Sequence, residues 1–218
     1  MRSIRRLPVM PARVRALALV VALALNALLV APVFAAQHVA LRSTDDRADD
    51  PRVDAAVLRM AKVYDSVQWE VGEIVGIVDG DTADIRIGKR RVERLRLNEI
   101  DAPERGAPWS KRSKQLLSDL IYGKEVMIAI TDWDRDDRAV ARIFVWSDDG
   151  KTLVDVSQAM ILQGGAWYFE KFSKDRALRG AEDTARKAGA GVWSIPAEHR
   201  IPPWQWRKMS KAERDLHR

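Results

Sequence analysis

The sequence predicts an α+β domain built mainly around a small β barrel, and three observations lead to this prediction. Five short segments between residues 69 and 146 have strand character. One helical segment separates the third strand from the fourth, and two further helical segments follow the fifth. Strands interrupted by a single helix, with the remaining helices at the end, are typical of an α+β domain rather than of a repeating β-α-β fold.

The first three strands are expected between residues 69 and 97. Residues 74–78 are apolar, and residues 79–82 (Asp-Gly-Asp-Thr) form a turn between two strands. Alternating apolar positions then predict the second strand at Ala83, Ile85 and Ile87. Gly88-Lys89 indicates another turn, and the β character continues at Val92, Leu95 and Leu97.

The second half of the domain combines helices and strands. A helix is expected at about Ser110–Ile121, where leucines and an isoleucine fall on one face. Strands follow at residues 126–130 and 140–146, and residues 148–150 (Asp-Asp-Gly) form a hairpin turn. Helices at about Val154–Gln163 and Lys174–Ala188 complete the domain, with Gly189 in the C-cap role. Five strands and about three helices favour an OB-fold barrel, although element order alone leaves other α+β folds open.

The N-terminal region is typical of a secretory signal peptide. Five arginines and no acid precede an apolar run from Ala16 to Ala36, and Val33-Phe34-Ala35 places small or modest residues at the expected cleavage point. We therefore expect a signal peptide at residues 1–35 and a secreted or periplasmic protein. An uncleaved segment that anchors the chain in a membrane is the alternative, since the run approaches the ~20 apolar residues that span a bilayer.

The signal segment accounts for most of the net positive charge of the chain. The whole chain has 37 basic and 31 acidic residues and a net charge of +6, but its first 35 residues contribute five arginines. The remaining chain has a net charge of about +1, so the high isoelectric point is poor evidence for nucleic-acid binding. The chain has no cysteine, which excludes disulfides and thiolate metal sites.

Two further regions flank the expected domain at residues 69–195. Residues 36–68 are charged and turn-rich, which predicts a disordered linker with at most a short helix. Residues 196–218 form a basic tail that contains Trp204 and Trp206. This tail is expected to dock on the domain, although a basic-aromatic contact surface is the alternative.

The segment Ile100-Asp101-Ala102-Pro103-Glu104 carries the clearest chemical signal. Pro103 fixes its own φ and favours an extended conformation at Ala102. The Asp101 and Glu104 carboxylates and the Ala102 carbonyl can then be directed at one point. Charged and carbonyl oxygens are the ligands that Ca²⁺ prefers.

Two arginines complete a set of groups suited to phosphodiester cleavage. Arg96 lies five residues before Asp101, and Arg138 begins the strand at residues 138–141. Either arginine alone is more often part of a plain ion pair. Cleavage of a phosphodiester, however, requires cationic groups around the phosphorus, a metal that polarises the phosphate and a carboxylate that orients water.

Together these motifs resemble the thermonuclease (staphylococcal nuclease-like) family. The resemblance rests on residues 79–82, on Arg96-Leu97 with residues 100–104, on residues 134–143, and on the closing segments Gln163–Tyr168 and Gly191–Trp193. It covers about Glu70 to Trp193. It implies an OB-fold barrel with packed helices and Ca²⁺-dependent endonuclease-type hydrolysis of DNA and RNA.

The resemblance also implies roles for individual residues. Asp81 and Asp101, with the main-chain oxygen of Ala102, match the Ca²⁺ ligands. Glu104 matches the general base or the group that positions the attacking water. Arg96 and Arg138 match the phosphate-binding pair, and Asp79 matches a nearby acid without an assured ligand role.

The chain departs from the family pattern before Arg138. Relatives commonly have Tyr-Gly there, whereas this chain has Asp136-Asp137. We expect weaker substrate binding or an altered dependence on pH and metal. Trp167, Tyr168 and Phe172 are candidates to stack on bases instead, although packing is an equal alternative for Trp167.

A different class of function stays open at this point. The alternative to an enzyme is a non-catalytic OB-fold module of the cell envelope that binds nucleic acid or protein. The presence of all the acids and both arginines favours catalysis. The sequence implies no stable protein partner, and we expect a monomer.

Overall fold

The computed structural model describes residues 67–150 and 152–217. One compact unit, Val67–Asp149 with Leu153–Arg218, contains every helix and strand given below. The expected signal peptide, and the expected linker as far as residue 66, lie outside the described residues. No helix within the described ranges is long and apolar enough to cross a membrane.

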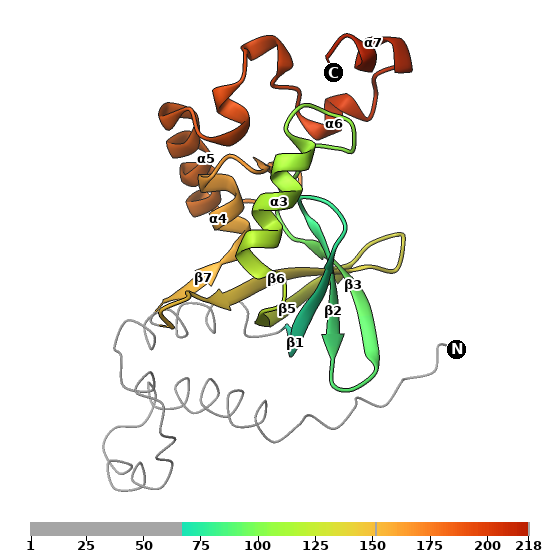
Figure 1. Cartoon of the computed structure of the whole chain (residues 1–218), viewed down its shortest axis with the longest axis vertical. Helices are drawn as coiled ribbons and strands as arrows, with labels where there is room; N and C mark the ends of the chain where they lie inside the picture. Colours follow the sequence, from blue (N-terminus) through green and yellow to red (C-terminus); the bar gives the residue numbers. More distant parts are fainter. Residues whose placement is uncertain (1–66, 151, 218) are drawn as a thin grey trace, which may run out of the picture. The chain divides into compact units, whose positions relative to one another are not determined.

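Five strands form a closed mixed barrel, as predicted (Figure 1). These are β1 (Gln68–Ile77), β2 (Thr82–Ile87), β3 (Arg91–Leu97), β5 (Glu125–Trp133) and β6 (Ala139–Trp146). The strand order is β3-β2-β1-β5-β6, and the parallel pairing of β3 with β6 closes the barrel. The other neighbours along this order pair antiparallel. The chain therefore has an OB-fold of the α+β class, as the sequence predicts.

Alternating apolar residues on the strands fill the barrel. Ile85 and Leu95 are completely buried on the neighbouring strands β2 and β3, and Ile128 and Ile143, which pair with each other across β5 and β6, are completely buried as well. Burial of an isoleucine or leucine side chain stabilises a fold by about 1.5–3 kcal/mol relative to exposure. These positions alternate with partly or fully exposed ones on β3, which explains the period of two in the sequence.

Three helices pack beside the barrel: α3 (Ser110–Ile121), α4 (Val156–Leu162) and α5 (Arg176–Ala188). The range expected for α3 is confirmed. The helix expected from Val154 begins instead at Val156, because Leu153–Asp155 forms a short strand, β7, paired with β6. Asp155 and Asp175 are the N-caps of α4 and α5, and Gly189 ends α5 in the left-handed conformation (φ 61°), as predicted.

A buried arginine connects the barrel to both helix N-termini. Arg142 on β6 is 4% exposed and forms ion pairs with Asp155, Asp175 and Glu99. The two aspartates cap α4 and α5, so one guanidinium links both caps to the barrel wall. A buried charge is stable only when it is paired in this way.

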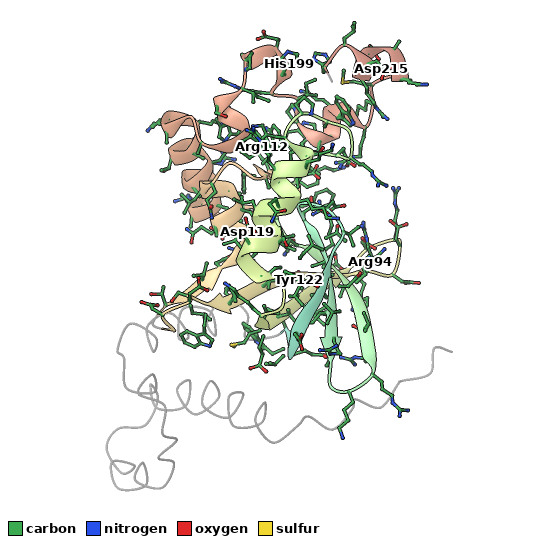
Figure 2. All side chains as sticks on the ribbon, viewed as in Figure 1. Arg94, Arg112, Asp119, Tyr122, His199 and Asp215 are labelled. Atoms are coloured by element: carbon green, nitrogen blue, oxygen red, sulfur yellow. The ribbon has the colours of Figure 1, made fainter. Side chains whose placement is uncertain are left out.

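The remaining elements connect the barrel to the C-terminus. A two-stranded sheet forms from β4 (Ile100–Asp101) and β8 (Trp167–Tyr168). After α5 come two short 3₁₀ helices, η1 (Gly191–Ser194) and η2 (Ala197–His199), and two short helices, α6 (Pro203–Trp206) and α7 (Lys211–Asp215). Figure 2 shows His199 and Asp215 on this C-terminal segment at the top of the view, above Tyr122, which follows the last residue of α3.

Candidate active site

The turn between β1 and β2 places Asp81 at one edge of the barrel. The backbone N–H of Asp81 donates to the Asp79 carboxylate (3.1 Å), and the Asp81 carbonyl accepts from the Leu97 N–H (2.8 Å). Gly80 packs directly on α3, where an added Cβ atom would lie 1.9 Å from the Ser113 hydroxyl oxygen. The turn therefore needs glycine for close approach, and this contact fixes the neighbouring aspartate.

Strand register then brings Arg96 between two carboxylates. Thr82 pairs with Arg96 across β2 and β3, which places Arg96 beside the preceding Asp81. Arg96 Nη1 lies 2.9 Å from Asp81 Oδ2, and its Nη2 lies 3.1 Å from Asp101 Oδ1. One guanidinium thus spans both acids, which are 7% and 1% exposed.

The Asp81 carboxyl is in an environment that disfavours its charge. Burial raises the pKa of Asp81 to about 7, although Arg96 opposes this effect. Asp79 and Asp101 add negative potential and raise the pKa, whereas the hydrogen bond from the Ala102 N–H lowers it. A buried carboxylate with a second acid beside it is the environment that a bound cation would stabilise.

The proline-containing loop connects the two acids through the backbone. The Ala102 N–H donates to Asp81 Oδ2 at 2.6 Å, so the peptide between Asp101 and Ala102 is held against the first aspartate. Glu104 follows Pro103 and is 37% exposed at its side chain. The structure thus brings Asp81, Asp101, Ala102 and Arg96 together, with Glu104 at the solvent side.

A third arginine, Arg207, lies at the two acids and was not predicted from the sequence. Arg207 Nη2 and Nη1 donate to the two Asp101 oxygens at 2.7 and 3.2 Å, and Nη1 also donates to Glu104 Oε1 at 2.5 Å. The hydrogen bond to Asp101 is the largest of the effects that raise the Arg207 pKa further above its ordinary range. The only sequence signal was the basic character of the tail, which did not indicate where the tail docks.

Arg138 lies at the same edge because β3 and β6 are parallel neighbours. Ala139, next to Arg138, pairs with Leu95, next to Arg96. Arg138 Nε donates to Asp134 Oδ2 at 2.7 Å, and Nη2 lies 3.7 Å from the Asp136 carboxylate. Burial alone would raise the Asp134 pKa, but hydrogen bonds from Arg138 outweigh it and the pKa is lowered.

Asp137 occupies the left-handed region of backbone conformation, with φ 56°. Glycine adopts this conformation without steric cost, and aspartate tolerates it better than most residues do. This geometry gives a physical reason why a glycine would suit the position. The aspartate retains the turn but adds a charge next to Arg138.

The expected stacking residues differ in their accessibility. Trp167 is 3% exposed and packs edge-on against Trp193, with ring centroids 5.6 Å apart, so its faces are not open to a base. Tyr168 is also buried, and its hydroxyl donates to the Ser173 carbonyl (2.7 Å). The burial of Trp167 matches the packing alternative, and Tyr168, which was expected only to stack on bases, is buried as well. Phe172 is 62% exposed, and Trp133, which was not among the predicted stacking residues, is 53% exposed.

One cleft collects most of these residues. Its volume is about 1330 Å³, larger than the 300–1,000 Å³ typical of small-molecule pockets. Its lining includes Asp81, Arg96, Asp101, Glu104, Arg138, Trp133, Phe172 and Arg207. A cleft of this size with paired acids and arginines suits a polymeric, phosphate-bearing ligand.

The residues present fit a hard cation at Asp81 and Asp101. Two carboxylates lie within the span of one guanidinium, and a main-chain carbonyl, that of Ala102, follows the second. Within the described part of the chain, no three His, Cys, Asp or Glu side chains form a group that could hold a metal by themselves. A cation here would therefore depend on two carboxylates supplemented by a carbonyl and water, a donor set that Ca²⁺ accepts.

The fold and the cleft define a class: an OB-fold protein with an acid- and arginine-lined cleft at one edge of its barrel. Residues 94–195 match the family described as staphylococcal nuclease homologue. This range includes Arg96, Asp101, Glu104 and Arg138, and Asp81 precedes it.

Three relatives extend this comparison. The chain is 34% identical to a micrococcal nuclease of Shigella flexneri over 145 residues, covering 64% of this chain and 82% of the relative. It is 34% identical to protein ParB of Escherichia coli over 66% of this chain and 82% of the relative. An uncharacterized endonuclease of Haemophilus influenzae is 33% identical, over 63% of this chain and 73% of the relative. The chain belongs to the staphylococcal nuclease family, and it is a nuclease, a hydrolase of phosphodiester bonds.

Proposed function

We propose that this nuclease hydrolyses DNA and RNA in a Ca²⁺-dependent reaction at the cleft between Asp81 and Arg138. The observation that carries the proposal is the bridge that Arg96 forms between Asp81 and Asp101, within a cleft that also contains Glu104 and Arg138. DNA and RNA share the phosphodiester bond, and the arginines and acids of the cleft are suited to bind the phosphate rather than a base. The site can therefore act on both nucleic acids.

Asp81, Asp101 and the Ala102 carbonyl would hold the cation. When bound, Ca²⁺ would polarise the scissile phosphate and offset its negative charge. The Ala102 N–H contact keeps the loop close to Asp81, so that the second aspartate and the carbonyl stay near the first. The buried Asp81 binds a cation only in its ionised form, so proton and cation compete for it.

Glu104 would accept a hydrogen bond from the attacking water and then its proton. The water oxygen bonds to phosphorus while the ester P–O bond breaks, and the departing oxygen takes a proton from solvent. Arg96 and Arg138 would donate to the non-bridging oxygens, which gain charge in the transition state. Glu104 is accessible to solvent, as a residue that binds water must be.

The test is cleavage of denatured DNA and of RNA by the purified domain. We expect activity with added Ca²⁺ and none after EGTA is added. Glu104→Gln and Arg138→Ala should each slow cleavage by about 10²–10³-fold, the range for loss of one catalytic group. Full activity in EGTA, or in either variant, would contradict the mechanism.

Matched controls exist on the same barrel. Arg94 lies two residues before Arg96 on β3 and pairs with Asp84 at the surface, outside the main cleft. Glu73 pairs with Arg86 and is 46% exposed at its side chain. Arg94→Ala and Glu73→Gln remove the same charges at residues that do not line the main cleft, and both should leave cleavage within a factor of about two, since surface pairs contribute little.

We further propose that the chain is exported, by means of the basic and apolar segment at residues 1–35. Expression of the full chain followed by N-terminal sequencing of the mature protein tests this. A mature N-terminus at Ala36 in the periplasm or medium is expected. Retention of residue 1 in a membrane fraction would instead favour an uncleaved anchor.

A further inference from the structure

Arg207 contacts two of the residues that the proposed function requires. Its guanidinium meets both Asp101 oxygens and one Glu104 oxygen, at 2.5–3.2 Å. Its side chain nevertheless remains 44% exposed, compared with 17% for Arg96. The guanidinium therefore contacts the buried Asp101 and the partly exposed Glu104 while it also faces the open cleft.

The C-terminal segment that carries Arg207, residues 197–217, is anchored to the domain. The Trp204 ring stacks on Phe169, with centroids 5.5 Å apart and planes 2° from parallel. Trp206 is 2% exposed. Arg214 donates to the carbonyls of Trp206 (3.1 Å) and Arg207 (3.2 Å). The backbone at Arg207 is thus fixed, while its long side chain reaches the cleft.

The acidic character of the cleft explains why a cation at position 207 would assist the binding of nucleic acid. Acidic residues outnumber basic residues in its lining. Arg138 is already partnered by Asp134 and Asp136, and Arg96 by Asp81 and Asp101. A polyanion would be repelled by such a cleft, so every cation that can turn toward a phosphate matters to binding. The C-terminal segment contributes two such residues, Arg207 and Lys208.

We propose that Arg207 is a further phosphate-binding residue of the nuclease site, resting on Asp101 and Glu104 when no nucleic acid is bound. The proposal rests on the proposed function for the position of the scissile phosphate. The planar guanidinium fork that fits a carboxylate also fits two oxygens of a phosphate, so exchange of partners needs only side-chain rotation. After the exchange, Asp101 keeps its contact with Arg96, and Glu104 is released to accept water.

The experiment measures binding of a labelled phosphorothioate single strand, which resists hydrolysis, by fluorescence anisotropy in Ca²⁺ at several salt concentrations. Arg207→Ala should weaken binding about tenfold, the effect of one charged hydrogen-bonding pair. It should also make the slope of log K against log salt shallower by roughly 0.7, the contribution of one phosphate contact on a single strand. Arg207→Lys should retain the slope, because it retains the charge.

Arg94→Ala is the control for a lost positive charge and should leave the slope unchanged, since Arg94 does not line this cleft. Steady-state cleavage adds a second readout: Arg207→Ala should raise KM more than it lowers kcat. An unchanged slope and unchanged KM in Arg207→Ala, with normal thermal stability, would overturn the proposal while leaving the nuclease mechanism intact. If the wild type cleaved DNA without Ca²⁺ while Arg207→Ala still bound the single strand more weakly, the Ca²⁺ mechanism would be overturned and the phosphate contact supported.

Discussion

Gly80 lies so close to Ser113 that a Cβ atom on the glycine would come within 1.9 Å of the serine hydroxyl oxygen. The hydroxyl cannot easily move away, because it donates to the Gly165 carbonyl at 2.6 Å and Ser113 is completely buried. The turn that carries Asp81 is therefore held against helix α3 by close packing.

Gly80→Ala should destabilise the protein by about 1–3 kcal/mol, the usual cost of overpacking. Because the clash displaces the turn, nuclease activity should fall as well, even where the variant is folded. Urea unfolding measures the first effect and DNA cleavage the second.

Gly180→Ala is the matched control: Gly180 lies in α5 with nothing within 4 Å of an added Cβ, so alanine should stabilise by about 0.5–1 kcal/mol. Equal effects of the two substitutions would show that the Gly80 contact has no special role.

Asp81 should make stability depend on pH in the metal-free protein. Its pKa is about 7 in the folded chain and 3.8 as an ordinary aspartate, so the folded state favours the protonated form. The resulting stability is fully present below about pH 4 and is lost as pH rises through 7. Asp81→Asn cannot titrate, so its stability relative to wild type should rise with pH, by about 1.4 kcal/mol per unit of pKa difference.

Urea unfolding in EDTA between pH 4 and 8 measures this difference. Asp84→Asn serves as the comparison, since Asp84 is a surface partner of Arg94. A difference between Asp81→Asn and wild type that stays constant over this pH range would show that burial does not disfavour the Asp81 charge.

Local patterns in the sequence predicted most of the fold. The helix at residues 110–121 has apolar residues at helical spacing, and Gly189 is a glycine at a helix end, so neither depends on distant contacts. The start of α4 was placed two residues early, because Asp155 caps that helix and Val154 belongs to a strand that exists only through pairing with β6. Strand pairing is a non-local property that local periodicity does not show.

The residues of the candidate site that are close to one another in sequence could be predicted. Asp101, Ala102 and Glu104 lie within four residues of one another, and Arg96 and Arg138 are the cations that phosphodiester chemistry requires beside them. The family resemblance added Asp81 and the roles of the individual residues. Arg207 was not predictable, because it lies 106 residues from Asp101 and no periodic pattern precedes it. The sequence also could not decide between packing and stacking for Trp167, because a tryptophan between glycines and aromatic residues suits a core as well as a binding face.

Removal of the negative charges before Arg138 should strengthen substrate binding. Asp136 lies 3.7 Å from the Arg138 guanidinium and is 61% exposed at its side chain. Asp136→Asn should lower KM by up to several-fold, a modest effect because solvent screens an exposed charge. Asp137→Gly removes the second charge and also suits the φ of 56°, so it should lower KM and raise stability by no more than the ~1–2 kcal/mol that the left-handed conformation costs an L-residue. Cleavage kinetics and urea unfolding measure both effects, and a raised KM in either variant would contradict this account of the substituted pair.

Arg207 should also compete with cations for the acids that it contacts. Its guanidinium donates to both Asp101 oxygens and to Glu104. A cation that binds Asp101 must therefore displace these hydrogen bonds and is repelled by the nearby positive charge. Arg207→Gln should therefore bind Tb³⁺ several-fold more tightly than wild type in the absence of nucleic acid, since one opposing charge near a partly buried site is worth on the order of 1 kcal/mol. Tryptophan-sensitised Tb³⁺ luminescence measures this affinity without reference to activity, and Arg94→Gln should bind Tb³⁺ as the wild type does. Weaker Tb³⁺ binding by Arg207→Gln would mean that Arg207 holds Asp101 in the orientation needed for the cation, because removing a competitor can only strengthen binding.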